Sequence, residues 1–159
     1  MNDFFLIIPA FEPDYTLLDF LKSMKEYTGE EGLPAPKILV VDDGSSEKCR
    51  EIFQEAQAYG RVLHHEKNRG KGAALRTAFS YIQEGHGLGY MVTADADGQH
   101  VWRDVKRVAA EARNHPRALV TGVRDFVGRV PLRSRLGNGI TRGVFSLTTG
   151  TALRDTQCG

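Results

Sequence analysis

The sequence is poor in the features that define several large protein classes, and each shortage removes a class. Its two cysteines, Cys49 and Cys158, are too few for a disulfide-stabilised scaffold and favour a reducing compartment. No apolar run approaches the roughly 20 residues that a membrane-spanning helix requires. The first residues lack the basic segment of a secretory signal peptide, and their apolar run ends at Pro9. These observations predict a cytoplasmic protein.

The net charge is small and gives no support for nucleic-acid binding. The 159 residues carry 21 basic and 20 acidic side chains, a formal charge of +1. The charge is distributed unevenly, because the stretch 124–142 contains arginines at 124, 129, 133, 135 and 142 but a single acidic residue, Asp125. Such a basic segment can contact an anionic membrane surface, so peripheral attachment to the cytoplasmic face of a membrane is a second expectation.

Short apolar segments alternate with segments of helical periodicity along the chain. Strands are predicted over 4–8, 38–41, 61–65, 90–94 and 118–121. Helices are predicted over 17–25, 70–83, 101–114 and 132–147, and a further one, capped by Ser45 or Ser46, to about Tyr59. Alternation of this kind, with nearly continuous apolar strands, predicts an α/β fold: a Rossmann-like, mostly parallel sheet with helices on both faces.

Three clusters of interest fall at the carboxyl ends of predicted strands, at 9–12, 42–45 and 95–99. Because ligands of parallel sheets bind outside the carboxyl ends of the strands, these clusters predict one binding site. In the third cluster, an extended backbone would direct the carboxylates of Asp95 and Asp97 to the same side. Two close like charges are best tolerated with a cation between them, which favours Mg²⁺ or Mn²⁺ on a diphosphate. The alternative is a polar loop that caps the next helix.

Two common nucleotide-binding motifs are excluded by the residues found where each motif would stand. The first strand is followed by Pro-Ala-Phe-Glu-Pro at 9–13, not by the Gly-x-Gly-x-x-Gly of dinucleotide-binding domains. The segment 68–72 reads Asn-Arg-Gly-Lys-Gly, but neither Ser nor Thr follows Lys71, and His65 stands where a P-loop has its first glycine. Both assignments are therefore rejected.

Four motifs, in this order, resemble those of family 2 glycosyltransferases. They are Ile-Pro-Ala-Phe-Glu at 8–12, Val-Asp-Asp-Gly-Ser-Ser at 41–46, Asn-Arg-Gly-Lys-Gly-Ala-Ala-Leu at 68–75 and Asp-Ala-Asp-Gly-Gln-His at 95–100. The likeness is strongest to the dolichol-phosphate mannosyltransferase-like branch. Asp-Thr-Gln-Cys-Gly at 155–159 also resembles the late motif of that branch. The resemblance implies a GT-A fold, a nucleotide-diphosphate sugar donor, a divalent metal and inversion at the anomeric carbon.

The same resemblance implies where the donor binds. The loop after the first strand would line the pocket for base and ribose, Asp42 would hydrogen-bond the base, and Asp43 and Ser45 would lie nearby. Lys71, at a helix start between two glycines, would bind the diphosphate. The structural alternatives are helix capping by the Asp-Gly-Ser-Ser run and a solvated surface lysine. The implied nucleotide-sugar-binding set is Pro9, Ala10, Phe11, Glu12, Asp42, Asp43, Lys71, Asp95, Ala96 and Arg135, with Arg133 an alternative to Arg135.

Metal-binding and catalytic residues follow from the resemblance in the same way. Asp95, Asp97 and Gln99 would hold Mg²⁺ or Mn²⁺, and Asp97, Asp155 and Arg124 form the expected catalytic set. Metal and arginine would neutralise the charge that grows on the departing nucleoside diphosphate. Asp155 would act on the acceptor side. For each arginine the alternative is a solvated helical face, and for Asp155 it is a loop cap.

The acceptor, and catalysis itself, stay open at this stage. A polyprenyl phosphate, which the branch favours, is already an anion and needs no strong base, whereas a sugar hydroxyl needs a carboxylate base. A third possibility is a truncated module that binds nucleotide-sugar without turnover, because the chain stops at Gly159 where the family fold normally continues. We expect one incomplete domain, with the donor site in 1–100, the start of the acceptor side in 101–159, and self-association through exposed apolar surface.

Overall fold

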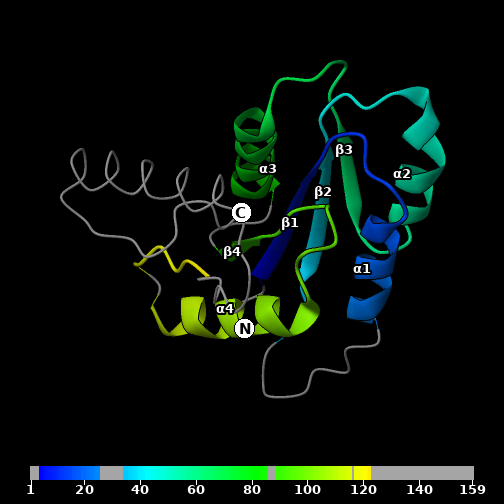
Figure 1. The fold of residues 1–159 in the computed structure, drawn as a ribbon. Coiled ribbons are helices and arrows are strands. Elements are labelled where there is room, and N and C mark those ends of the chain that lie inside the picture. Colours follow the sequence, from blue (N-terminus) through cyan, green and yellow to red (C-terminus); the bar gives the residue numbers. More distant parts are fainter. Residues whose placement is uncertain (1–3, 26–33, 86–88, 116, 123–159) are drawn as a thin grey trace, which may run out of the picture. The chain divides into compact units, whose positions relative to one another are not determined.

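The computed structural model describes residues 4–25, 34–85, 89–115 and 117–122 (Figure 1). The chain divides into two compact units, Met1–Val120 and Thr121–Gly159, and all described helices and strands belong to the first. The strands are β1 (Phe4–Ala10), β2 (Lys37–Asp42), β3 (Arg61–His64) and β4 (Tyr90–Thr93). The helices are α1 (Thr16–Lys25), the short 3-10 helix η2 (Glu47–Cys49), α2 (Arg50–Ala56), α3 (Lys71–Gly85) and α4 (Trp102–Asn114).

The strands form one parallel sheet in the order β3-β2-β1-β4. Ala10 at the end of β1 pairs with Asp42 of β2, which in turn pairs with His64 of β3. These three residues therefore stand level at the carboxyl edge. On the other side of β1, Thr93 pairs with Ile7, so β4 ends deeper in the sheet. The predicted parallel α/β architecture is confirmed.

Alternating side chains of the strands build a core on each face of the sheet. One core joins Leu6, Ile8 and Val40 to buried residues of α1, α2 and α4. The other joins Ile7 and Val41 to α3 through Ala74, Ala78 and Ile82. In Figure 1, α3 accordingly lies on the opposite side of the sheet from α1 and α2. Small alanines on α3 let this helix approach the strands closely, and each buried Ile or Leu contributes about 1.5–3 kcal/mol.

The structure corrects two predictions about secondary structure. Residues 118–121 are not a strand: the amide of Ala118 donates to the carbonyl of His115 in a turn, and Leu119 is 89% exposed. Its apolar side chain therefore gains no burial that would reward pairing with the sheet. The helix after β2 ends at Ala56 rather than near Tyr59, and it begins with the 3-10 turn η2. The helix predicted over 132–147 lies outside the described residues.

Within the described ranges, the helices are too short or too polar for any of them to span a bilayer.

Candidate active site

The candidate site lies at the carboxyl edge of the sheet, where the chain changes direction. From β1 the chain adds β2 and then β3 on one side, and it returns through α3 to place β4 on the other side of β1. The loops that leave β1 and β4 lead to α1 and α4, which pack in the same core, and a Cβ on Gly98 after β4 would lie 3.1 Å from Cβ of Thr16 at the start of α1. Ligands of parallel sheets bind outside the carboxyl ends of the strands. The motif at 9–12 covers the end of β1 and the motif at 95–100 follows β4, so the topology places both at the carboxyl ends of neighbouring strands.

The loop after β1 is fastened to the loop after β2 through Glu12. The Glu12 amide donates to Oγ of Ser45 (2.9 Å), and its carboxylate accepts from the amide (2.6 Å) and the hydroxyl (3.0 Å) of Ser46. The hydrogen bonds from Ser46, the backbone one above all, lower the pKa of Glu12. Glu12 holds a φ of 49°, a left-handed conformation that non-glycine residues seldom adopt. Phe11 beside it is half exposed, whereas Ala10 is buried.

These contacts correct the predicted cap of the helix after β2. Neither serine hydroxyl caps it: Ser46, at the N-cap of η2, makes no such bond, and Oγ of Ser45 accepts from Glu12. The carboxylate of Glu12 accepts the Ser46 amide instead, a capping role supplied from a different loop.

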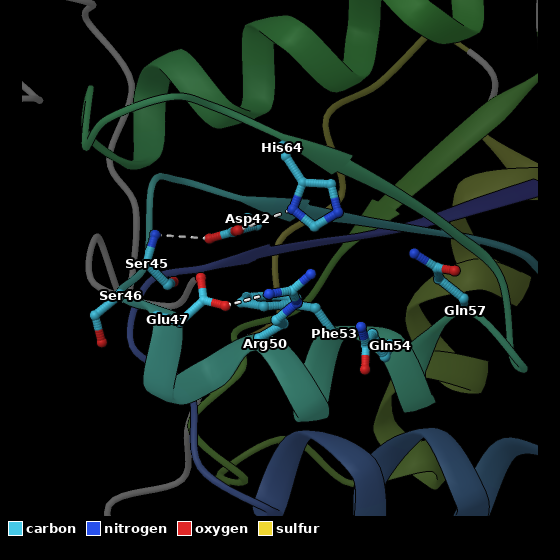
Figure 2. Close-up of a pocket in the computed structure, with 9 residues that line it drawn as sticks. All are labelled: Asp42, Ser45, Ser46, Glu47, Arg50, Phe53, Gln54, Gln57 and His64. Carbon is cyan, nitrogen blue, oxygen red and sulfur yellow. Dashed lines mark hydrogen bonds and ion pairs between the residues drawn. The ribbon is translucent and has the colours of Figure 1, made fainter.

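Asp42 is held between its own loop and β3. Its Oδ1 accepts from the amide of Ser45 and its Oδ2 from Nδ1 of His64, both at 2.9 Å (Figure 2). The side chain is 11% exposed, and it borders a cavity of about 260 Å³ beside α2. Figure 2 shows Arg50 and Gln54 on α2, and Gln57 directly after it, along this cavity. Asp42 thus presents a partly engaged carboxylate at a polar opening.

Asp43 points the other way, into the protein. Its side chain is only 4% exposed, and it accepts from Nδ1 of His65 (2.6 Å) and from the amides of Arg69 (3.1 Å) and Gly70 (2.7 Å). Burial acts to raise the pKa of Asp43, but the hydrogen bond from His65 and the two amides outweigh it, and the pKa is lowered. The structure therefore gives two aspartates that are neighbours in the sequence very different surroundings.

The loop after β4 carries the two aspartates of the predicted metal motif. Nζ of Lys71, the first residue of α3, lies 2.6 Å from Oδ1 of Asp95, and Nε2 of His100 lies 3.9 Å from the other oxygen. Oδ1 of Asp97 accepts from the amide of Gln99 (3.0 Å). Because β4 ends at Thr93, the two aspartates lie in a loop, so the predicted convergence by strand alternation is wrong.

The donor atoms of this loop suit a divalent metal, although the described part of the chain contains no cluster of three or more His, Cys, Asp or Glu side chains placed to hold one. Asp95 and Asp97 offer carboxylate oxygens and Gln99 an amide oxygen, which are the ligand types of Mg²⁺ and Mn²⁺. Asp95 is 31% exposed and already faces a cation, the ammonium of Lys71. The residues present therefore fit the chemistry of such an ion.

Predicted site residues fall into two groups by location. Residues of the first group are linked by contacts between strand-end loops. Glu12 joins the loop after β1 to the loop after β2, and Asp43 joins the loop after β2 to the loop after β3. Lys71 joins α3 to the loop after β4. Pro9 and Ala96 lie in the same strand-end region, both partly buried. Arg124, Arg135 (with its alternative Arg133) and Asp155 lie outside the described residues.

Sequence reasoning missed His64, His65 and Thr77. The two histidines follow one another at the end of β3, as Asp42 and Asp43 do at the end of β2, and the register pairs Asp42 with His64. The sequence offers one signal for these histidines, namely an Asp-Asp and a His-His dipeptide that each stand at the end of a predicted strand. The signal can be interpreted only once β2 and β3 are known to pair.

Sequence comparison identifies relatives along the whole chain. An uncharacterized protein of Methanocaldococcus jannaschii is 31% identical over 99% of this chain and 63% of its own length. A UDP-N-acetylglucosamine–dolichyl-phosphate N-acetylglucosaminyltransferase of Methanococcus voltae is 26% identical over 98% of this chain and 66% of its own. The dolichyl-phosphate beta-glucosyltransferase of Saccharomyces cerevisiae is 27% identical over 97% and 52%. The chain thus spans between about half and two thirds of the length of these relatives.

Solved structures confirm the fold. Residues 1–349 of Staphylococcus aureus TarS superpose with a TM-score of 0.56 at 22% identity, covering 81% of this chain and 38% of that one. The mannosyltransferase PcManGT of Pyrobaculum calidifontis, solved with GDP-Man and Mn²⁺, gives a TM-score of 0.52 at 20% identity, with 81% and 38% covered. Residues 5–157 match the protein family described as "Glycosyl transferase family 2", so one family covers nearly the whole sequence. This chain belongs to glycosyltransferase family 2.

Proposed function

We propose that the protein transfers a sugar from a nucleotide-diphosphate sugar to a polyprenyl phosphate, with a divalent metal and with inversion at the anomeric carbon. The observation that carries this proposal is the set of contacts joining four strand-end loops at the carboxyl edge of the sheet. Relatives in Methanococcus voltae and yeast are named for transfer to dolichyl phosphate, which supports the acceptor. The Mn²⁺ and GDP-Man bound to PcManGT support the metal and the donor class.

The proposed donor site uses groups from each loop. Phe11, half exposed beside the buried Ala10, offers an aromatic wall for the base, and Asp42 offers a carboxylate oxygen to a base N–H. The ammonium of Lys71 stands at the N-terminus of α3, where the helix dipole also favours a diphosphate. Asp95, Asp97 and Gln99 would hold Mg²⁺ or Mn²⁺, which when bound neutralises charge on the departing diphosphate.

The chemical step needs little from the protein if the acceptor is a phosphate. An oxygen of the lipid phosphate attacks the anomeric carbon from the face opposite the donor diphosphate, and the bond from that carbon to the diphosphate oxygen breaks as the new one forms. The nucleophile is already an anion, so no general base is required. Arg124 and Arg135 are proposed to stabilise the leaving group, and Asp155 to orient the acceptor.

A sugar-hydroxyl acceptor is the second candidate, and it makes a different demand. A hydroxyl must lose a proton as it attacks, so the mechanism would require a carboxylate base, for which Asp155 is the candidate. A polyprenyl phosphate would instead need no protein carboxylate to act as a base.

Calorimetric titration of the 159-residue chain with UDP and GDP, each with and without Mn²⁺, tests the donor site. We expect binding that requires Mn²⁺ and is lost in Asp97→Ala, while Asp104→Ala, on the exposed face of α4, binds as the wild type does. Transfer from the preferred donor to dolichyl or undecaprenyl phosphate, with the anomer of the product read by NMR, then tests the reaction. Failure of a folded chain to bind either nucleotide would overturn the proposal.

A further inference from the structure

A hydrogen-bonded trio, two of its side chains buried and the third, Thr77, partly buried, connects the end of β2, the loop after β3 and the middle of α3. Nδ1 of His65 lies 2.6 Å from Oδ1 of Asp43, and Nε2 of the same ring lies 2.9 Å from Oγ1 of Thr77. The side chains of Asp43 and His65 are 4% and 5% exposed. Since a carboxylate only accepts, the Nδ1 proton points at Asp43, and when the ring carries that proton alone, Nε2 accepts the Thr77 hydroxyl proton.

The Asp43–His65 pair of this trio is too deeply buried to act on a substrate itself. An aspartate, a histidine and a hydroxyl in series form the arrangement that activates nucleophiles in hydrolases. Here the ring uses both nitrogens within the protein, and the carboxylate of Asp43 also accepts the amides of Arg69 and Gly70. The amide of Asp43 in turn donates to the carbonyl of Ala10, which ties the trio to β1.

These contacts hold α3 at two points along its length. Gly70 directly precedes Lys71, the first residue of α3, and the carbonyl of Gly70 accepts from the amides of Ala73 and Ala74 in the first turn. Thr77 lies six residues beyond Lys71, about 9 Å further along the helix axis. Two attachments to one Asp–His pair fix both the axial position and the rotation of the helix, and rotation determines where the side chain of Lys71 points.

We propose that Asp43 and His65 are positioning residues that direct Lys71 toward Asp95 and the donor diphosphate, and that neither contacts the donor. The distance of 2.6 Å between Nζ of Lys71 and Oδ1 of Asp95 is the outcome of this arrangement. The inference rests on the proposed function only for the ligand that Lys71 binds. It differs from the assignment of Asp43 as a direct donor contact, because its carboxylate faces His65, Arg69 and Gly70.

Three substitutions separate the attachments of the ring. His65→Asn keeps a donor near the Nδ1 position and so retains the bond to Asp43, but it loses the bond to Thr77. His65→Gln reaches the Nε2 position and loses the bond to Asp43. Thr77→Val removes only the hydroxyl and serves as the mildest variant. Melting temperatures report whether each variant folds.

A double-mutant cycle with Lys71→Ala distinguishes positioning from independent contact. We expect His65→Gln to weaken donor binding about tenfold when Lys71 is present and less than about twofold when it is replaced. His65→Asn should lose less than His65→Gln. Equal losses in both backgrounds would overturn the proposal, as would unchanged binding in a folded His65→Gln variant.

A readout without nucleotide separates failure of this inference from failure of the proposed function. Amide hydrogen exchange at Arg69 and Gly70 should accelerate about tenfold in His65→Gln but not in Lys71→Ala. Unchanged exchange in His65→Gln would refute the positioning role even if the wild type binds donor. If exchange accelerates in His65→Gln but the wild type binds no nucleotide, the result would support the attachment of α3 by Asp43 and His65 and would refute the proposed donor site instead.

Discussion

Gly44 is the position where one added methyl group should most disturb the candidate site. It follows Asp43 with a φ of +77°, and a Cβ placed there would lie 2.2 Å from the carbonyl carbon of Lys67 and 2.4 Å from the nitrogen of Asn68. Those are backbone atoms and cannot rotate away, and carbon atoms normally pack about 3.5–4.0 Å apart. The loop after β3 must therefore shift by more than about 1 Å to accept Gly44→Ala.

The cost has two parts of known size. A left-handed conformation costs a non-glycine residue about 1–2 kcal/mol, and overpacking against a fixed neighbour costs about 1–3 kcal/mol. Gly44→Ala should therefore destabilise the protein by about 2–5 kcal/mol. Gly70→Ala is the matched control, because Gly70 has a φ of +86° and nothing lies within 4 Å of its added Cβ. It should show the conformational cost alone, about 1–2 kcal/mol.

Urea unfolding followed by circular dichroism measures both variants against the wild type. Gly44→Ala should also weaken donor binding, because the displaced segment leads directly to Lys71, the first residue of α3. If the two variants lose the same stability to within about 0.5 kcal/mol, the close approach of the two loops contributes nothing and the reasoning is refuted.

Three further predictions concern single side chains. The pKa of Asp43 is lowered in the folded state, so the stabilisation by its carboxylate is present above the unfolded pKa and is lost as pH falls through the folded pKa. The difference in free energy of unfolding between the wild type and Asp43→Asn should therefore shrink between about pH 5 and 3. A difference that stays constant would contradict this. Ser46→Ala removes one hydrogen bond to Glu12 and should cost about 0.5–1.5 kcal/mol in urea unfolding, whereas Ser46→Thr should cost less. Asp95→Asn breaks the ion pair with Lys71, whose side chains are one-third to one-half exposed, so it should cost under about 1 kcal/mol of stability. It should nevertheless remove Mn²⁺-dependent nucleotide binding. Loss of folding instead would assign Asp95 a structural role.

Much of the fold was predictable because local patterns and tertiary packing agree. The run at 4–8 is apolar throughout and became β1, buried on both faces. The run at 118–121, Ala-Leu-Val-Thr, is also mainly apolar, but it lies in a turn region after α4, where Leu119 is exposed. An apolar segment is thus buried only when another element packs against it, and the local sequence of the segment does not identify that element.

The candidate site was less predictable for the same reason. The order of motifs placed Lys71 and Asp95 in one site, and the structure brings their side chains together at 2.6 Å. The role of Ser46 was misassigned, because the acceptor of its amide is Glu12, 34 residues earlier in the sequence. Capping preferences describe a helix and its nearest residues, so they cannot identify a cap supplied by another loop.

The Asp-Asp and His-His dipeptides show how one strand-end pattern serves two purposes. Alternation along β2 and β3 sends Asp42 and His64 to the face that α2 covers, and sends Asp43 and His65 to the face that α3 covers. On the first face, His64 is half exposed at a cavity, and its Asp42 partner remains near solvent. On the second face, both members are buried and their remaining bonds go to α3 and its preceding loop. A pair beside an opening can exchange its partner for a ligand, whereas a buried pair can only hold the backbone around it. We therefore propose different roles for the two aspartates, although they are adjacent and chemically identical.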